Sequence, residues 1–146
     1  MPATYKSLVD AANAVGSRRD GGWPDRAGAA ARLVSRLVSW ADEGVVGTAL
    51  PVPSGLHRVW PRVEVVLEGA ARSAQVAGTG PRLAVLRAQR SGDDAVVERV
   101  EAVAAMRDGE ARRTVVVTAD RGLSARVRAA GAAVVGPGWL LDLIPG

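Results

Sequence analysis

The chain has 146 residues, of which 48% are hydrophobic and 23% charged, and it contains no Cys. This length and composition favour a single folded domain over residues 1–146 and argue against intrinsic disorder. The lack of Cys excludes disulfide scaffolds, thiol nucleophiles and Cys-ligated zinc. No apolar run approaches the ~18 residues of a membrane helix, and the first residues lack a secretory pattern. We therefore expect a cytoplasmic protein without a membrane partner.

Basic residues outnumber acidic ones by 19 to 15, which gives a formal net charge of +4 at pH 7. Every basic residue except Lys6 is Arg. The planar guanidinium group matches phosphate and carboxylate, so the excess is compatible with a polyanionic partner. A GC-rich genome would produce the same bias, and net charge alone decides nothing about function.

The first half of the chain predicts one strand, one helix and one long connection. Ser7–Val9 is a short apolar run that ends at Asp10. Over Arg26–Trp40, apolar residues recur every three or four positions, as in an amphipathic helix, and Asp25 is placed to cap it. The segment 44–62 holds three prolines and no clear period. We expect a Pro-rich loop there, with a function as a flap.

Strands and helices alternate over the second half of the chain. The predicted strands are Val63–Leu67, Leu83–Leu86, Thr114–Thr118 and Ala132–Val135, and the predicted helices run from Asp93 to about Asp108, from Arg121 to Ala130 and from Trp139 to Leu143. Short runs that are apolar throughout are typical of strands buried on both faces, hence of a parallel sheet. The alternation predicts an open α/β sheet of four or five mostly parallel strands rather than a barrel.

Acidic residues follow the predicted strands. Asp10, Glu68 and Asp120 each come at a strand end, and Asp93 and Asp94 open the helix after the third strand. The carboxyl ends of parallel strands share one edge of a sheet, where ligands bind. Like charges that converge there destabilise one another unless a cation joins them. Oxygen ligands suit Mg²⁺ or Mn²⁺, so the pattern indicates a divalent-metal site.

Each acid also has a purely structural interpretation. Asp10 could cap a turn, and Glu68 could be an ordinary strand exit. Asp93 or Asp94 could cap the second helix or favour its dipole, and Asp120 could cap the third. These interpretations are individually comfortable, but all of the acids project to one edge, and that coincidence favours a site.

Four local sequences together are similar to a known family. They are Val9-Asp-Ala-Ala-Asn13, Ser91-Gly-Asp-Asp-Ala-Val-Val97, Val117-Thr-Ala-Asp-Arg-Gly-Leu123 and Ala130-Gly-Ala-Ala-Val134. In this order they resemble the NYN domain, and particularly its YacP-like branch, within the PIN-like nuclease superfamily. The resemblance spans residues 8 to about 141, and its first and last motifs are the specific ones.

The resemblance implies a three-layer α/β/α fold and a metal-dependent ribonuclease. It makes Asp10 a metal ligand, and it makes Asn13 a residue that orients the site or a substrate phosphate. Asp93 matches the helix-start acid of the family best, because the apolar Val96 follows three positions later. The implied catalytic residues are Asp10, Asn13, Asp93 and Asp120, and the implied ligands of Mg²⁺ or Mn²⁺ are Asp10, Glu68, Asp93, Asp94 and Asp120.

Two positions refine this expectation. Asp120 matches the acid of a Thr/Ser-x-Asp strand end, with Thr118 as a neighbour that could donate a hydrogen bond to it. Glu68 stands where the wider family usually has Asp. Its side chain is one methylene longer, so the metal distance and the number of ions held stay open.

RNA is the expected partner. Arg residues that follow strand ends or lie near the acids could bind its phosphates: Arg18, Arg19, Arg26, Arg72, Arg90 and Arg121. Base stacking would use Trp23 or Trp60, whereas Trp40 and Trp139 occupy amphipathic positions typical of a core. His57, the sole His, lies in the Pro-rich segment without a nearby acid and is expected to be inert.

Other functions stay open at this point. A nucleotide phosphohydrolase would use similar acids, although the chain lacks a GxxxxGK[ST] loop. A non-catalytic RNA-binding module with a degenerate site would explain Glu68. A dinucleotide cofactor is disfavoured, because no G-x-G-x-x-G follows the first strand. The oligomeric state, including a homodimer, is not determined by the sequence.

Overall fold

The computed structural model describes residues 6–11, 14, 26–50, 58–69, 74, 82–89, 91–106 and 114–144. The side chains of residues 26, 48 and 104–106 are outside this description. Asn13, Arg18, Arg19, Trp23, Asp25, His57, Arg72 and Arg90, together with the side chain of Arg26, therefore lie outside the described residues, and the roles predicted for them stay predictions.

Within this part of the chain, five strands form one sheet in the order β5-β4-β1-β6-β7. Every neighbouring pair in it is parallel. The strands are β1 (Lys6–Asp10), β4 (Arg62–Leu67), β5 (Leu83–Arg87), β6 (Thr114–Val117) and β7 (Ala133–Val135), and the helices are α2 (Arg26–Glu43), α3 (Gly92–Met106), α4 (Arg121–Ala129) and α5 (Pro137–Leu143). The predicted parallel α/β sheet is confirmed, with each predicted element present.

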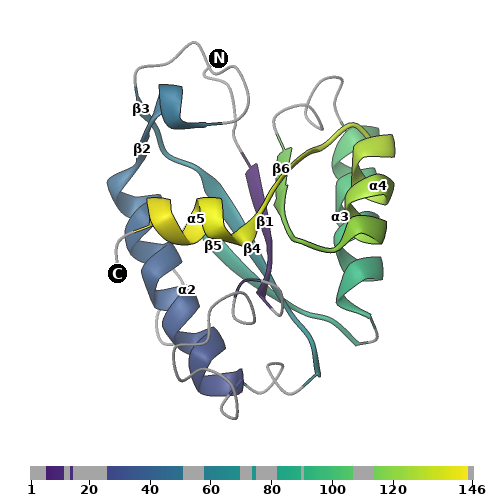
Figure 1. Cartoon of the computed structure of the whole chain (residues 1–146), viewed down its shortest axis with the longest axis horizontal. Helices are drawn as coiled ribbons and strands as arrows, with labels where there is room; N and C mark the ends of the chain where they lie inside the picture. The colour runs from purple at the N-terminus through teal and green to yellow at the C-terminus, as the bar shows by residue number, and fades with distance from the viewer. Residues whose placement is uncertain are drawn as a thin grey trace.

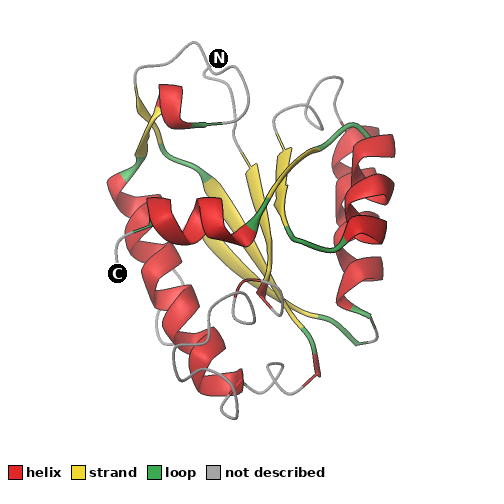
Figure 2. Ribbon diagram, viewed as in Figure 1, coloured by secondary structure: helices red, strands yellow, loops and turns green. Residues whose placement is uncertain are grey.

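Helices cover both faces of the sheet and make three layers (Figures 1 and 2). Successive side chains of a strand point to opposite faces, so an apolar run fills two cores. Val9 packs in the cluster that contains α2 and α5, whereas Leu8 packs in the cluster of α3 and α4. In β6, Val115 and Val117 share the first cluster and Val116 the second. The three-layer α/β/α arrangement agrees with the expected fold.

The segment 44–62 contains more secondary structure than its composition predicts. β2 (Val45–Val46) pairs antiparallel with β3 (Arg58–Val59), and a 3₁₀ turn, η1, covers Gly47–Ala49. Gly44 joins α2 to β2 with φ of +80°, and a Cβ there would lie 3.0 Å from the indole nitrogen of Trp60. Residues 51–57 of this segment lie outside the description, so the Pro-rich loop and its function as a flap stay predictions.

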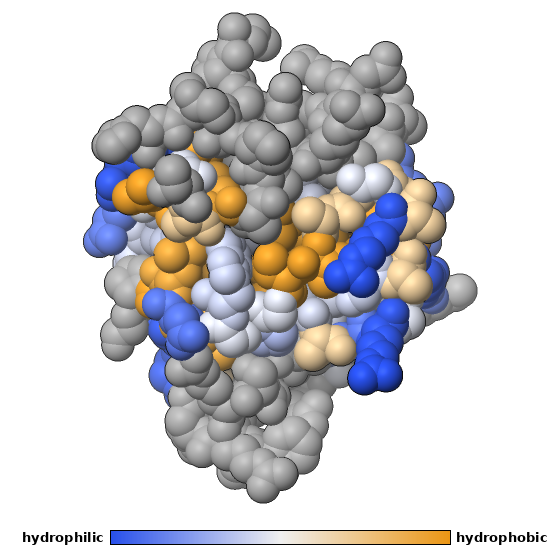
Figure 3. All heavy atoms as spheres, turned by 45° about the horizontal axis from the view of Figure 1, so that its top comes forward, coloured by the Kyte–Doolittle hydropathy of each residue, from blue (hydrophilic) through white to orange (hydrophobic). Residues whose placement is uncertain are grey.

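The three described tryptophans differ in exposure. Trp40, a residue of α2, is 3% exposed in the core, and Trp139 packs partly buried against the same cluster. Trp60 is 46% exposed. On the face shown in Figure 3, hydrophobic areas outside the grey atoms are separated by hydrophilic side chains. None of the described helices has the length and apolarity required to cross a membrane.

A small ion network links β1, β4 and α3. Glu64 accepts hydrogen bonds from Arg99 Nε at 2.9 and 3.0 Å, and Lys6 Nζ lies 3.0 Å from its Oε1. Burial raises the pKa of the Glu64 carboxyl, but the hydrogen bonds and charges of Arg99 and Lys6 outweigh it. The net effect is a pKa below the ordinary value of 4.5. Glu64 therefore stabilises the fold above that pH, and the contribution is lost as the pH falls through the lowered pKa.

Glu64→Gln should lower the free energy of unfolding at pH 7 by about 2 kcal/mol, because Lys6 and Arg99 lose the charge that compensates theirs. The value is below that of a fully buried pair, since the Arg99 side chain is 39% exposed. Urea unfolding measures it. The matched control is Glu98→Gln, an exposed Glu of α3, expected within about 0.5 kcal/mol of wild type. Equal effects of the two substitutions at pH 7 would contradict the role given to Glu64.

Candidate active site at the carboxyl edge of the sheet

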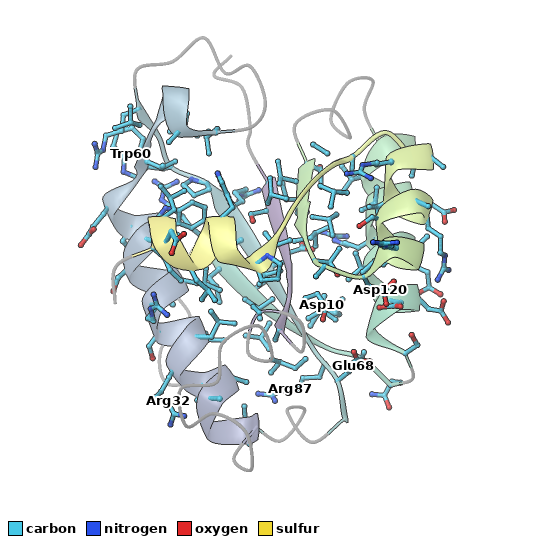
Figure 4. All side chains as sticks on the ribbon, viewed as in Figure 1. Asp10, Arg32, Trp60, Glu68, Arg87 and Asp120 are labelled. Atoms are coloured by element: carbon cyan, nitrogen blue, oxygen red, sulfur yellow. The ribbon has the colours of Figure 1, made fainter. Side chains whose placement is uncertain are left out.

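The chain order of the strands reverses at β1. From β1 the chain builds β4 and then β5 on one side, and it then crosses to build β6 and β7 on the other. In such sheets the crevice outside the carboxyl ends of the strands, at the reversal, is where ligands bind. Asp10, Glu68 and Asp120 all lie at this edge, at the lower ends of the strands in Figure 4. Asp10 is the last residue of β1, and Glu68 and Asp120 follow the adjacent strands β4 and β6.

Asp10 is held between the two strands at the reversal. The register pairs Val9 with Val117, so Asp10 and Thr118 come next at the same level. Thr118 Oγ1 donates to Asp10 Oδ2 at 3.4 Å, and both residues are 2% exposed. Thr118 Oγ1 also accepts from the backbone nitrogen of Asp120 at 3.1 Å. The predicted contact between Thr118 and Asp120 thus involves the backbone of Asp120, and the carboxylate that receives the hydroxyl is that of Asp10.

Asp120 begins α4, as its structural interpretation predicts. Its Oδ1 accepts from the backbone nitrogen of Leu123 at 2.9 Å, and its backbone carbonyl accepts from Ser124 Oγ at 2.8 Å. This is the N-cap geometry that satisfies a free amide at a helix start. Among the described residues no donor contacts Oδ2. The cap therefore fixes the carboxylate while leaving one oxygen for a ligand.

A Ser rather than an Asp caps α3. Ser91 Oγ accepts from the backbone nitrogen of Asp93 at 3.1 Å and from that of Asp94 at 3.5 Å. The structural interpretation in which Asp93 or Asp94 caps this helix is wrong, because both lie inside its first turn. Ser is a preferred N-cap residue, so the Ser91 that precedes the two acids could have been recognised from the sequence as the cap of this helix.

Glu68 reaches across to the same helix. Its Oε2 accepts from the backbone nitrogen of Gly92 at 2.6 Å. The structure thus gives this strand-end acid a defined partner at the start of α3, which sequence reasoning missed.

The pKa of Asp93 is affected by the other acids at this edge. Burial is the largest cause of a pKa above the ordinary value of 3.8. The negative charges of Asp120, Asp10 and Glu68 raise the pKa further, in that order. The charge of Arg126 lowers it, but not enough to offset the other causes. Four acids that are distant in the sequence therefore interact at one edge of the sheet.

The two remaining described residues of the predicted site lie differently. Asp94 Oδ1 accepts from Arg126 at 2.9 Å in an exposed ion pair, so α4 supplies a cation for this acid. Arg121, the first residue of α4, is exposed. Within the described ranges, no three His, Cys, Asp or Glu side chains are grouped so as to hold a metal ion by themselves. The described acids at this edge offer only oxygen atoms as metal ligands, which suits a hard cation and not one that prefers nitrogen or sulfur.

Comparison with known proteins supports the fold. No family model matches the chain, and no curated protein matches it either. Among solved structures, a tryptophan-to-leucine mutant of Rae1 (YacP) from Bacillus subtilis superposes with a TM-score of 0.64 at 18% identity, covering 95% of this chain and 74% of that one. A second structure of Rae1 (YacP) gives a TM-score of 0.59 at 20% identity, with 93% and 71% covered. At this identity the likeness shows a shared fold.

Asp93→Asn should raise the melting temperature at pH 7 in a buffer with chelator, because it removes a charge that its neighbours disfavour. The folded protein holds the Asp93 proton more tightly than the unfolded chain does. The wild type therefore gains stability relative to the variant as the pH falls through the raised pKa towards 3.8. Thermal unfolding of both proteins between pH 7 and pH 4 measures this difference. Asp94→Asn is the control, and its melting temperature should not rise. If the melting temperature of Asp93→Asn at pH 7 is also no higher than that of the wild type, the electrostatic coupling is refuted.

Proposed function

We propose that this protein is a ribonuclease that hydrolyses RNA phosphodiester bonds with Mg²⁺ or Mn²⁺ at the carboxyl edge of its sheet. The observation that carries the proposal is the meeting of Asp10, Asp93 and Asp120 where the strand order reverses, because two adjacent strands and a helix start bring these acids together. The motif resemblance to NYN domains supports it, and so does the fold shared with Rae1 (YacP), whose second name is that of the branch the motifs resemble.

The oxygen donors fit a hydrated divalent ion. Mg²⁺ usually keeps several waters and binds directly to only one or two carboxylates. Such an ion needs no group of three closely spaced side chains, so Asp10, Asp93 and Asp120 could hold it partly through water. A bound ion supplies a water of lowered pKa and neutralises charge on the phosphoryl oxygens.

Hydrogen bonds within the chain hold the three acids in place. Asp10 is buried and fixed by Thr118, Asp120 is fixed by the backbone of α4, and Asp93 by the capped first turn of α3. Rigid placement of charged groups costs no reorganisation at the moment of reaction, which is the source of much enzymatic rate enhancement.

Cations next to the acids fit an RNA backbone. Arg87 ends β5 at the same edge and lies near Glu68 in Figure 4, with its guanidinium donating to the carbonyl of Ala74 at 3.0 Å. Arg121 lies one residue after Asp120 and is exposed. Phosphate contacts of this kind position the substrate without reading its sequence. We therefore expect binding that weakens as salt increases.

Asp10→Asn and Asp120→Asn should each reduce cleavage of a fluorescent single-stranded RNA by about 100-fold, because the loss of ~3 kcal/mol of transition-state stabilisation has this effect. Asn keeps the size of Asp10 and remains a good helix cap at position 120, so the fold should persist. EDTA should abolish wild-type cleavage, and Mn²⁺ should restore it. Circular dichroism checks the folding of each variant.

The control is Asp42→Asn, an exposed acid near the end of α2, which should cleave like wild type. Cleavage that survives both site substitutions, or that ignores EDTA, would refute the proposed site. RNA that binds in a salt-dependent way but stays intact at every Mn²⁺ concentration would indicate the non-catalytic alternative. Hydrolysis of nucleoside triphosphates in place of RNA would indicate a phosphohydrolase.

A further inference from the structure

We propose that Glu68 is a positioning residue, whose carboxylate fixes the first turn of α3 and thereby Asp93, rather than a ligand of the metal. The inference rests on the proposed function for its catalytic consequence, and on contacts between β4 and α3 for its structural basis. It concerns a position where the NYN resemblance leads one to expect a metal-binding Asp.

The contact joins the end of β4 to the start of α3. Gly92 donates its backbone N–H to Glu68 Oε2 at 2.6 Å, over a separation of 24 residues. The first amides of a helix lack partners within it, and the helix dipole favours a negative charge there. A charge-assisted bond of this length is among the stronger hydrogen bonds in proteins. Glu68 therefore holds the helix start from outside the helix, while Ser91 caps the next two amides.

The space at Gly92 shows how closely the carboxylate is seated. A Cβ at this position would lie 2.7 Å from Glu68 Cδ and 2.9 Å from both carboxylate oxygens. The φ angle of Gly92 is not positive, so its backbone conformation is open to any residue. A side chain at this position would therefore have to displace the Glu68 carboxylate, whereas the backbone conformation excludes no residue. Glu68 and Gly92 therefore form one closely packed contact.

The extra methylene of Glu gives the side chain this reach. An Asp at position 68 would set the carboxylate back by about one C–C bond, or ~1.5 Å, which is too far for a hydrogen bond that is 2.6 Å long with Glu. The departure from the family pattern is therefore matched by Gly92 in the same structure. Since Asp93 follows Gly92 directly, fixing that amide fixes the approach of Asp93 to the other acids.

A double-mutant cycle on Glu68→Asp and Gly92→Ala tests the contact between these two residues without any activity measurement. Gly92→Ala should lower the melting temperature by about 5 °C, because its methyl group overlaps the Glu68 carboxylate. Glu68→Asp should also lower it, because the bond to the Gly92 amide is lost. In the double variant the shorter side chain makes room for the methyl group, so the two losses should not add. Additive losses would overturn the proposal.

Activity and metal affinity then separate positioning from ligation. Glu68→Gln keeps an acceptor for the Gly92 amide and should retain kcat and the Mn²⁺ Kd within about threefold of wild type. Glu68→Asp keeps the charge but loses the reach, and its kcat should fall about 10-fold or more with little change in KM for RNA. The opposite result, with Mn²⁺ affinity lost in Glu68→Gln and kept in Glu68→Asp, would make Glu68 a ligand and overturn the proposal.

The two hypotheses fail in different ways. A wild-type protein that neither binds Mn²⁺ nor cleaves RNA refutes the proposed function. In that event, non-additive melting temperatures still support the structural link between Glu68 and Gly92, and additive ones still refute it.

Discussion

The constraint on which this structure depends is that the five strands described in its main sheet all run in one direction. Both faces must then be covered by helices, so the central strands β1, β4 and β6 bury apolar side chains on two sides. Because β1 occupies the centre of the sheet and the chain order reverses there, the carboxyl ends of β4, β1 and β6 are neighbours. The site is thus a consequence of the direction of the sheet.

Bringing carboxylates together is unfavourable, and the chain limits the cost with backbone and hydroxyl donors. Leu123 supplies an amide to Asp120, Gly92 supplies one to Glu68, and Thr118 supplies a hydroxyl to Asp10. Each donor orients an acid without neutralising it. The charge that remains raises the pKa of Asp93. A carboxyl whose pKa is shifted by neighbouring charges is often found at a functional site.

The short apolar runs predicted the parallel sheet, and the residues that end them predicted the edge at which the acids lie. The three layers were implied by the resemblance to NYN domains. The sequence did not predict which partner each acid has. The pairing of Asp94 with Arg126 depends on how α3 and α4 lie side by side, over 32 positions of sequence. The strands β2 and β3 were missed because each has two residues, too few for a period. The contact between Glu68 and Gly92 required the register of β4.

Two acids in and just after β4 differ in how their charge is held. Glu64 and Glu68 are four apart, on the face of the sheet that α3 covers. Glu64 has two cations against it, Lys6 and Arg99, and its pKa is lowered. Glu68 is bound by one backbone amide, and no cation among the described residues forms an ion pair with it. The charge of Glu64 is thus compensated by cations of neighbouring elements, whereas the carboxylate of Glu68 is held by the first turn of α3.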